Sequence, residues 1–119
     1  MSKVVAFAES TWMDPKTDRR MWNQLGRAYG VTTSLWDQWD PPDDAQSAVV
    51  LVDQRGATPL TEFEHPVEAT YVFGRTGMNR MLQEIQHDHS VRIDTPHPIS
   101  LFGISAAAIV LADREAKLQ

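Results

Sequence analysis

The sequence predicts a single α/β domain built around a parallel β-sheet, and three observations support this fold class. Short runs rich in Val, Leu and Ile alternate along the chain with segments that have helical periodicity. The runs are continuously apolar, as is typical of strands buried on both faces of a parallel sheet. The chain has 119 residues, of which 42% are hydrophobic, enough for one modest core. We therefore assign residues 1–119 to one domain.

Each run predicts one element. Strands are predicted at Lys3–Ala8, Val31–Trp36, Ala48–Asp53 and Ala69–Gly74, with a shorter strand at Ser90–Asp94. Helices are predicted at Asp18–Tyr29, at Met78–His87 and from Ile104 to Arg114. The first helix has an apolar face that includes Trp22, and Gly30 ends it. The last helix contains three consecutive alanines, residues 106–108, which permit close approach of another backbone.

Composition and charge restrict the function. The chain has no cysteine, which excludes disulfides and thiolate chemistry. Its net charge of −5 opposes tight, non-specific binding to a phosphate backbone, so any nucleic-acid contact must be local. Basic residues do gather in one region, at Lys16, Arg19, Arg20 and Arg27. The sequence has no long apolar segment and no signal-peptide pattern, and we therefore expect a cytoplasmic protein.

We assign no catalytic or metal-binding role to the histidines and tryptophans. His65, His87, His89 and His97 are interpreted as surface residues, and we predict no metal site, because adjacent i and i+2 histidines suit one metal poorly. Trp22 is predicted to lie in the core. The remaining tryptophans could stack a base or seal a dimer, although core packing is the simpler interpretation; they are Trp12, Trp36 and Trp39.

Two loops could carry chemistry. Gly74-Arg75-Thr76-Gly77 follows the apolar run ATYVF and presents bare backbone at the carboxyl end of a predicted parallel strand, where ligands bind in open α/β sheets. A plain strand-to-helix turn explains the same residues. The second loop, within Ile93–Ser105, has a hydroxyl at Ser100 and leads into the alanine-rich helix.

Two long segments resemble a known family. Thr58–Gly77 (TPLTEFEHPVEATYVFGRTG) and Val91–Glu115 (VRIDTPHPISLFGISAAAIVLADRE) are similar to the second and third motifs of SPOUT RNA methyltransferases, the α/β-knot class. AYGV at Ala28–Val31 resembles the end of the first motif, so the resemblance covers the chain from about Asp18 onward.

The resemblance implies a fold, a cofactor and partners. It implies a C-terminal trefoil knot, a homodimer whose protomers share the active site, and S-adenosylmethionine as cofactor. The implied activity is methylation of an RNA, with the ribose 2′-hydroxyl of tRNA or rRNA as the expected target. The implied cofactor-binding positions are Gly74, Thr76, Ile93, Leu101 and Ala106, and Ser100 is an implied catalytic position.

Three positions depart from the family pattern. Gln24 stands where the first motif usually has arginine, Thr76 where the second has glutamate, and Phe102 where the third has asparagine. Glutamine cannot remove a proton and phenylalanine cannot donate a hydrogen bond. Arg20 and Arg27 share a helical face with Gln24 and are predicted to compensate as catalytic residues. The alternatives are a non-catalytic knotted binding or regulatory protein, or a plain nucleotide-binding α/β domain without a knot.

Overall fold

The computed structural model describes residues 2–7, 13–36, 47–75, 82, 84–97 and 99–118. The strands, in chain order, are β1 (Lys3–Phe7), β2 (Thr32–Trp36), β3 (Ala48–Val52), β4 (Thr58–Pro59), β5 (Ala69–Phe73) and β6 (His89–Arg92). The helices are α1 (Pro15–Tyr29), the 3-10 turn η1 (Leu60–Glu62) and α3 (Gly103–Leu118). No helix in these ranges is both long and apolar enough to cross a membrane.

The strands form one six-stranded sheet in the order β2-β1-β5-β3-β6-β4, and every recorded pairing is parallel. This confirms the predicted fold class. β5 lies in the middle, where Tyr71 pairs with Val4 of β1 on one side and with Val50 of β3 on the other. All residues of β5 are buried. Its carboxyl end at Phe73 therefore lies at the centre of one edge of the sheet.

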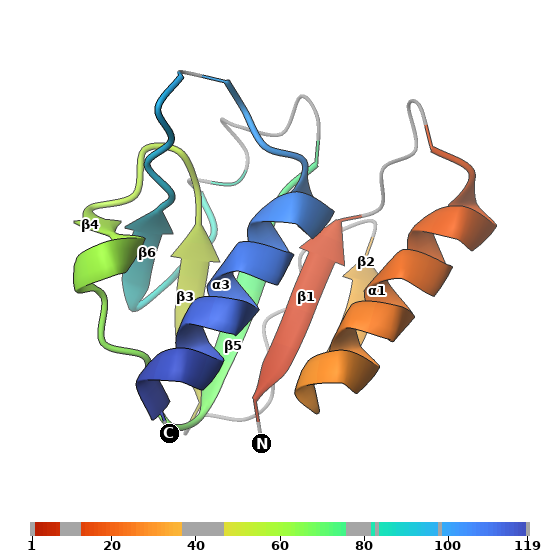
Figure 1. The fold of residues 1–119 in the computed structure, drawn as a ribbon, viewed down its shortest axis with the longest axis horizontal. Helices are drawn as coiled ribbons and strands as arrows, with labels where there is room; N and C mark the ends of the chain where they lie inside the picture. The colour runs from red at the N-terminus through yellow and green to blue at the C-terminus, as the bar shows by residue number, and fades with distance from the viewer. Residues whose placement is uncertain are drawn as a thin grey trace.

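Helices α1 and α3 lie side by side on one face of the sheet (Figure 1). Alternate residues of the strands point towards them, and Tyr71 and Phe73 pack there with Trp22 of α1 and Leu111 of α3. The predicted core position of Trp22 is confirmed, because that residue is only 3% exposed. The other face buries a second cluster, made of Phe7, Leu51, Val72, Leu82 and Ile85.

Local signals set the ends of α1. Asp14 caps its first turn by accepting hydrogen bonds from the backbone N–H and the hydroxyl of Thr17, and Pro15 occupies the first helical position. Gly30 ends the helix in the left-handed conformation with φ 66°, which explains why glycine stands there. Inside the helix, the buried carboxylate of Asp18 accepts a hydrogen bond of 3.1 Å from the indole Nε1 of Trp22.

The structure corrects several predicted boundaries. α3 continues four residues past Arg114, through good helix formers, to Leu118. β2 is an edge strand with partly exposed residues, whereas we predicted burial on both faces. β4 and η1 were not predicted, because a two-residue strand leaves no periodicity to detect. The predicted helix Met78–His87 lies largely outside the described residues. Of the part that is described, residues 84–87 are not helical, and Leu82 and Ile85 are buried.

Candidate functional site

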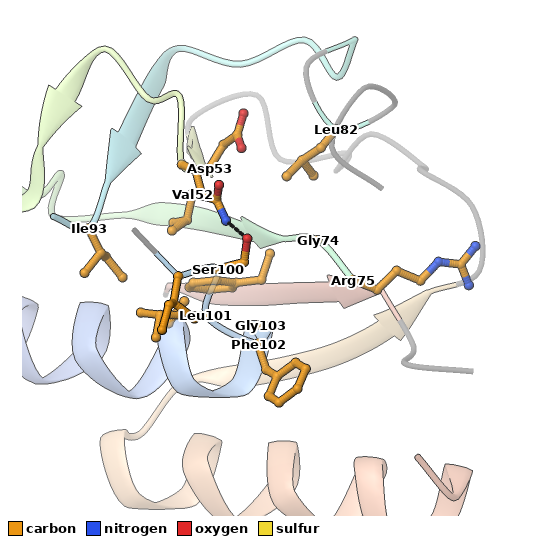
Figure 2. A pocket seen from close by; sticks show the side chains of 14 residues that line it. Val52, Asp53, Gly74, Arg75, Leu82, Ile93, Ser100, Leu101, Phe102 and Gly103 are labelled. Carbon is orange, nitrogen blue, oxygen red and sulfur yellow. Dashed lines mark hydrogen bonds between the residues drawn. The ribbon is translucent and has the colours of Figure 1, made fainter. Parts of the chain in front are cut away.

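A cavity of about 360 Å³ lies at the carboxyl edge of the sheet. The ends of β3 and β5 form one side of it, and the loop after β6 and the first turn of α3 form the other (Figure 2). Ligands of open parallel sheets bind at this edge, and the volume is within the range of small-molecule sites. The cavity is therefore the candidate ligand site of the chain.

The cavity brings together residues that are far apart in the sequence. Of the positions implied by the family resemblance, those in the described residues all line it: Gly74, Ile93, Ser100, Leu101 and Ala106. Thr76 lies outside the described residues. Ser100, Leu101 and Phe102 precede α3 on the same loop, and Figure 2 shows them beside the carboxyl end of β5.

Part of the cavity wall is bare backbone. A Cβ atom added at Gly103 would lie 2.8 Å from the carbonyl oxygen of Gly74 and 3.6 Å from the ring of Trp22. The first contact is shorter than carbon and oxygen tolerate, so only glycine lets α3 begin this close to the end of β5. A Cβ added at Gly74 would meet the side chain of Leu82 at 3.0 Å, a contact that a flexible side chain can relieve more easily.

Sequence reasoning missed the polar residues contributed by β3. Asp53 and Gln54 follow the last residue of that strand and line the cavity, and the amide Nε2 of Gln54 donates a hydrogen bond to the hydroxyl of Ser100. The sequence signal that could have found them is a polar residue directly after a buried strand, because the carboxyl ends of parallel strands lie together at the edge where ligands bind. Arg75 also lines the cavity. Apolar walls with a few polar groups are typical of small-molecule sites.

The predicted catalytic arginines are not part of this cavity. Arg20, Gln24 and Arg27 are all exposed on α1, as the predicted shared face requires. Arg27 instead lines a shallow depression with Asn23 and Thr32, near the amino end of β2. That end lies across the sheet from the cavity, because Thr32 pairs with Lys3 at the start of β1. Within one chain, only Ser100 of the three predicted catalytic residues lines the cavity.

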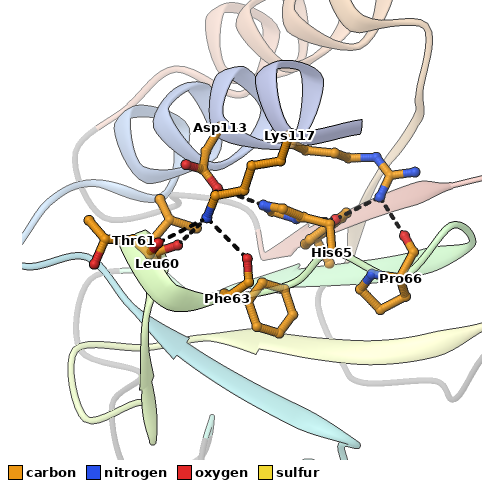
Figure 3. Close-up of polar contacts among 9 residues, drawn as sticks. Leu60, Thr61, Phe63, His65, Pro66, Asp113 and Lys117 are labelled. Carbon is orange, nitrogen blue, oxygen red and sulfur yellow. Dashed lines mark hydrogen bonds and ion pairs between the residues drawn. The ribbon is translucent and has the colours of Figure 1, made fainter. Parts of the chain in front are cut away.

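His65 is buried, so the prediction that all four histidines lie at the surface is wrong for this residue. Its ring nitrogens are satisfied inside the protein. Nδ1 lies 2.8 Å from the hydroxyl of Tyr71. Nε2 lies 2.7 Å from the carboxylate of Asp113, and Figure 3 shows this second contact. These partners replace water and make burial of the ring possible. His87, His89 and His97 are exposed as predicted.

The hydrogen bonds of Tyr71 determine the tautomer of His65. Arg114 can only donate, and its Nη1 lies 3.0 Å from the hydroxyl oxygen of Tyr71. The hydroxyl proton of Tyr71 therefore points to Nδ1 of His65, and the neutral imidazole carries its proton on Nε2, which donates to Asp113. We call His65, Tyr71, Asp113, Arg114 and Lys117 the His65 network.

The His65 network fixes the second half of α3. Lys117 lies 2.9 Å from the carboxylate of Asp113 and donates to the carbonyl oxygens of Leu60 and Phe63 at 2.6 and 3.0 Å (Figure 3). Arg114 donates to the carbonyls of Pro66 and Val67 at 2.6 and 2.7 Å. The network thus joins α3 to η1 and to the segment between η1 and β5.

Burial and hydrogen bonding shift the pKa values in this network. Burial lowers the pKa of His65 below its ordinary value of 6.5, although the hydrogen bond to Asp113 opposes the shift. For Asp113, burial acts to raise the pKa, but hydrogen bonds from His65 and Lys117 outweigh it and hold the pKa below the usual 3.8. Burial also raises the pKa of Tyr71. At neutral pH the network therefore holds a neutral histidine beside an ionised aspartate.

Comparisons with known proteins identify the fold. No protein-family profile matches this sequence, and no curated protein sequence matches it. Among solved structures, one described as giving insight into the 2-OH methylation of C/U34 on tRNA has a TM-score of 0.73 and 15% identity, and the match covers 99% of this chain and 91% of that one. A candidate RNA methyltransferase from Bacillus anthracis has a TM-score of 0.66 and 15% identity, with 98% and 94% covered.

A third structure has a bound cofactor. The SpoU methyltransferase AviRb from Streptomyces viridochromogenes, in complex with AdoMet, has a TM-score of 0.63 and 17% identity; the match covers 98% of this chain and 47% of AviRb. The fold of the chain is therefore SPOUT-like, which confirms the resemblance read from the sequence at the level of fold.

Proposed function

We propose that this SPOUT-like chain is an S-adenosylmethionine-dependent RNA methyltransferase that methylates the ribose 2′-hydroxyl of a tRNA or rRNA in the cytoplasm. The observation that carries the proposal is the cavity at the carboxyl edge of the sheet, which unites Gly74, Ile93, Ser100, Leu101 and Ala106. These are the described positions that the sequence resemblance assigned to the cofactor loops. The similarity to a structure tied to 2-OH methylation on tRNA, and to one with AdoMet bound, supports it.

The residues of the cavity fit this cofactor. Gly74 and Gly103 line the cavity without side chains, and Ile93 and Leu101 supply apolar contacts. Asp53 and Gln54 add polar groups that can bind hydroxyl and amino groups of a ligand. When bound, S-adenosylmethionine supplies an electrophilic methyl group. The chain has to orient the ribose hydroxyl in line with that group and to accept its proton.

We also propose that the chain forms the C-terminal trefoil knot of the SPOUT class. The close passage of Gly103 by the backbone of Gly74 supports this, because the start of α3 has to cross the end of β5 with no side chain between them.

A homodimer would complete the site. Arg20 and Arg27 do not line the cavity of their own chain, so a catalytic role requires that a second protomer brings its α1 to the cavity. Two apolar side chains are exposed in the first half of α3 or just before it: Phe102, just before the helix, is 49% exposed, and Ile109, on the helix, is 41% exposed. They give the second protomer a surface to cover. Sedimentation equilibrium at micromolar concentration is expected to show a dimer, and a purely monomeric protein would contradict this part of the proposal.

Methyl transfer is expected to depend on the exposed face of α1. Because Gln24 cannot stabilise charge as arginine does, the Arg20→Ala or the Arg27→Ala variant should lose about a hundredfold in rate, which corresponds to about 3 kcal/mol of transition-state stabilisation. Incorporation of tritiated methyl groups into bulk tRNA and rRNA measures this loss, with S-adenosylmethionine affinity measured in parallel. Gln24→Ala is the matched control on the same face and should retain activity.

The departures at Gln24, Thr76 and Phe102 favour one alternative, a non-catalytic SPOUT-like binding or regulatory protein. The same assay separates the two functions. If the wild-type protein binds S-adenosylmethionine and yet transfers no methyl group to a broad RNA pool, the regulatory function replaces the catalytic one.

A further inference from the structure

The loop that connects β6 to α3 forms one wall of the cavity. Its first residue, Ile93, packs against the core, but apolar burial does little to hold residues 99–102. Ile99 is 73% exposed, and Leu101 and Phe102 are 37% and 49% exposed. Exposed apolar groups contribute little to fixing a segment, because the stabilisation depends on the area removed from water. Other contacts have to determine where this loop lies.

Most hydrogen bonds recorded for this loop are local. The hydroxyl of Thr95 donates to the carbonyl of His97 at 2.6 Å, and the N–H of Ile99 donates to the same carbonyl at 2.8 Å. These bonds shape the turn but do not connect it to the rest of the sheet.

Within the part of the chain that the structure describes, a side-chain contact between Gln54 and Ser100 spans the cavity. The amide of Gln54, in the turn directly after β3, donates to the hydroxyl of Ser100, and 46 residues separate the two in sequence. Figure 2 marks this contact with a dashed line at Ser100, between the end of β3 and the loop. Both residues line the cavity, so the contact joins its two walls.

We propose that Gln54 is a positioning residue that holds the Ser100 loop, residues 99–102, over the cavity and thereby sets how long a bound ligand stays. The proposal rests on the proposed function for its ligand, S-adenosylmethionine, whereas the contact itself is a property of the free protein. Because both residues line the cavity, loss of this contact frees one wall to move relative to the other. Loss of the bond is expected to speed ligand release about fivefold, which is the net effect of one hydrogen bond.

The free protein gives the first test. In Gln54→Ala, amide hydrogen exchange should become faster at Ile99, whose N–H bonds to the carbonyl of His97 within the loop, and at Ala106, whose N–H bonds to the carbonyl of Phe102 where the loop enters α3. Gln54→Glu replaces the amide donor with a carboxylate that can accept a hydrogen bond from the Ser100 hydroxyl, so the contact can re-form in the opposite direction and slow exchange should return. Arg55→Ala, in the next exposed residue of the same turn, is the matched control and should exchange as the wild type does.

The bound protein gives the second test, in which labelled S-adenosylmethionine is chased with an excess of unlabelled cofactor. Gln54→Ala and Ser100→Ala should each release the label about fivefold faster, and the double variant no faster than either single variant, because both remove the same contact. The proposal would be overturned if the double variant released the label faster than either single variant by the product of their two effects. It would also be overturned if amide hydrogen exchange in Gln54→Ala were as slow as in Arg55→Ala. A wild-type protein that binds no cofactor would instead contradict the proposed function, and the exchange experiment would still decide the role of Gln54.

Discussion

Gly103→Val is expected to abolish S-adenosylmethionine binding, with a loss of affinity of at least a hundredfold. The added Cβ would lie 2.8 Å from the carbonyl oxygen of Gly74, and neither the end of β5 nor the start of α3 has a flexible side chain there that could move aside. The start of α3 would have to shift away from the sheet, and the cavity walls would separate. Overpacking of this kind costs about 1 to 3 kcal/mol in stability even where relaxation is possible.

Calorimetric titration with S-adenosylmethionine measures this loss, and circular dichroism checks that the variant folds. Ser105→Val is the matched control, because it adds the same side chain at an exposed position of the same helix and should bind normally. If Gly103→Val does not fold, Gly103→Ala, which adds only the Cβ, should fold and bind more weakly than the wild type. Normal binding by a folded Gly103→Val protein would show that the ligand site lies elsewhere.

His65→Phe is expected to lower the free energy of unfolding at pH 7 by about 3 kcal/mol, and the melting temperature by roughly 10 °C or more. Phenylalanine fills similar space but removes both ring nitrogens, which leaves the buried hydroxyl of Tyr71 without its acceptor and weakens the hydrogen bonding of Asp113. Thermal and urea unfolding measure the change. His97→Phe alters an exposed histidine and should change stability by less than about 0.5 kcal/mol.

The same variant is expected to change how stability depends on pH. The pKa of His65 is lower in the folded protein than its unfolded value of 6.5, so between these two values the unfolded chain binds more protons. Wild-type stability should therefore fall as the pH drops from 6.5 through the folded pKa of His65, and fall again below pH 3.8 as Asp113 is protonated. His65→Phe should lack the first decrease. An unchanged decrease below pH 6.5 in this variant would contradict the assignment.

Sequence patterns predicted the elements whose residues are continuously apolar. β3 and β5 end within one residue of their predicted ends. Strands in the middle of a parallel sheet have continuously apolar sequences, and the ends of such a run mark the ends of the strand. β4 was missed because a two-residue strand is defined by its partner β6 and not by its own residues. The end of α3 was placed too early because the contacts that fix it, from Lys117 to η1 and from Arg114 to the segment after η1, join residues about fifty positions apart.

The candidate site was predictable only in part. The resemblance to family motifs identified positions on the loops after β5 and β6, and the structure brings the described ones to one cavity. Asp53 and Gln54 belong to no such motif and were found only when the sheet order placed β3 beside β5. His65 was assigned to the surface because its partners, Tyr71 and Asp113, come together only through the packing of α3 on the sheet.

Titration of the wild-type protein with S-adenosylmethionine and S-adenosylhomocysteine by calorimetry tests the central claim most directly. We expect both ligands to bind at one site per chain, with micromolar or tighter affinity, because the cavity offers bare backbone, apolar walls and polar groups at the carboxyl edge of a SPOUT-like sheet. The absence of heat with either ligand, under conditions where the protein is folded, would contradict the claim that this cavity is a cofactor site.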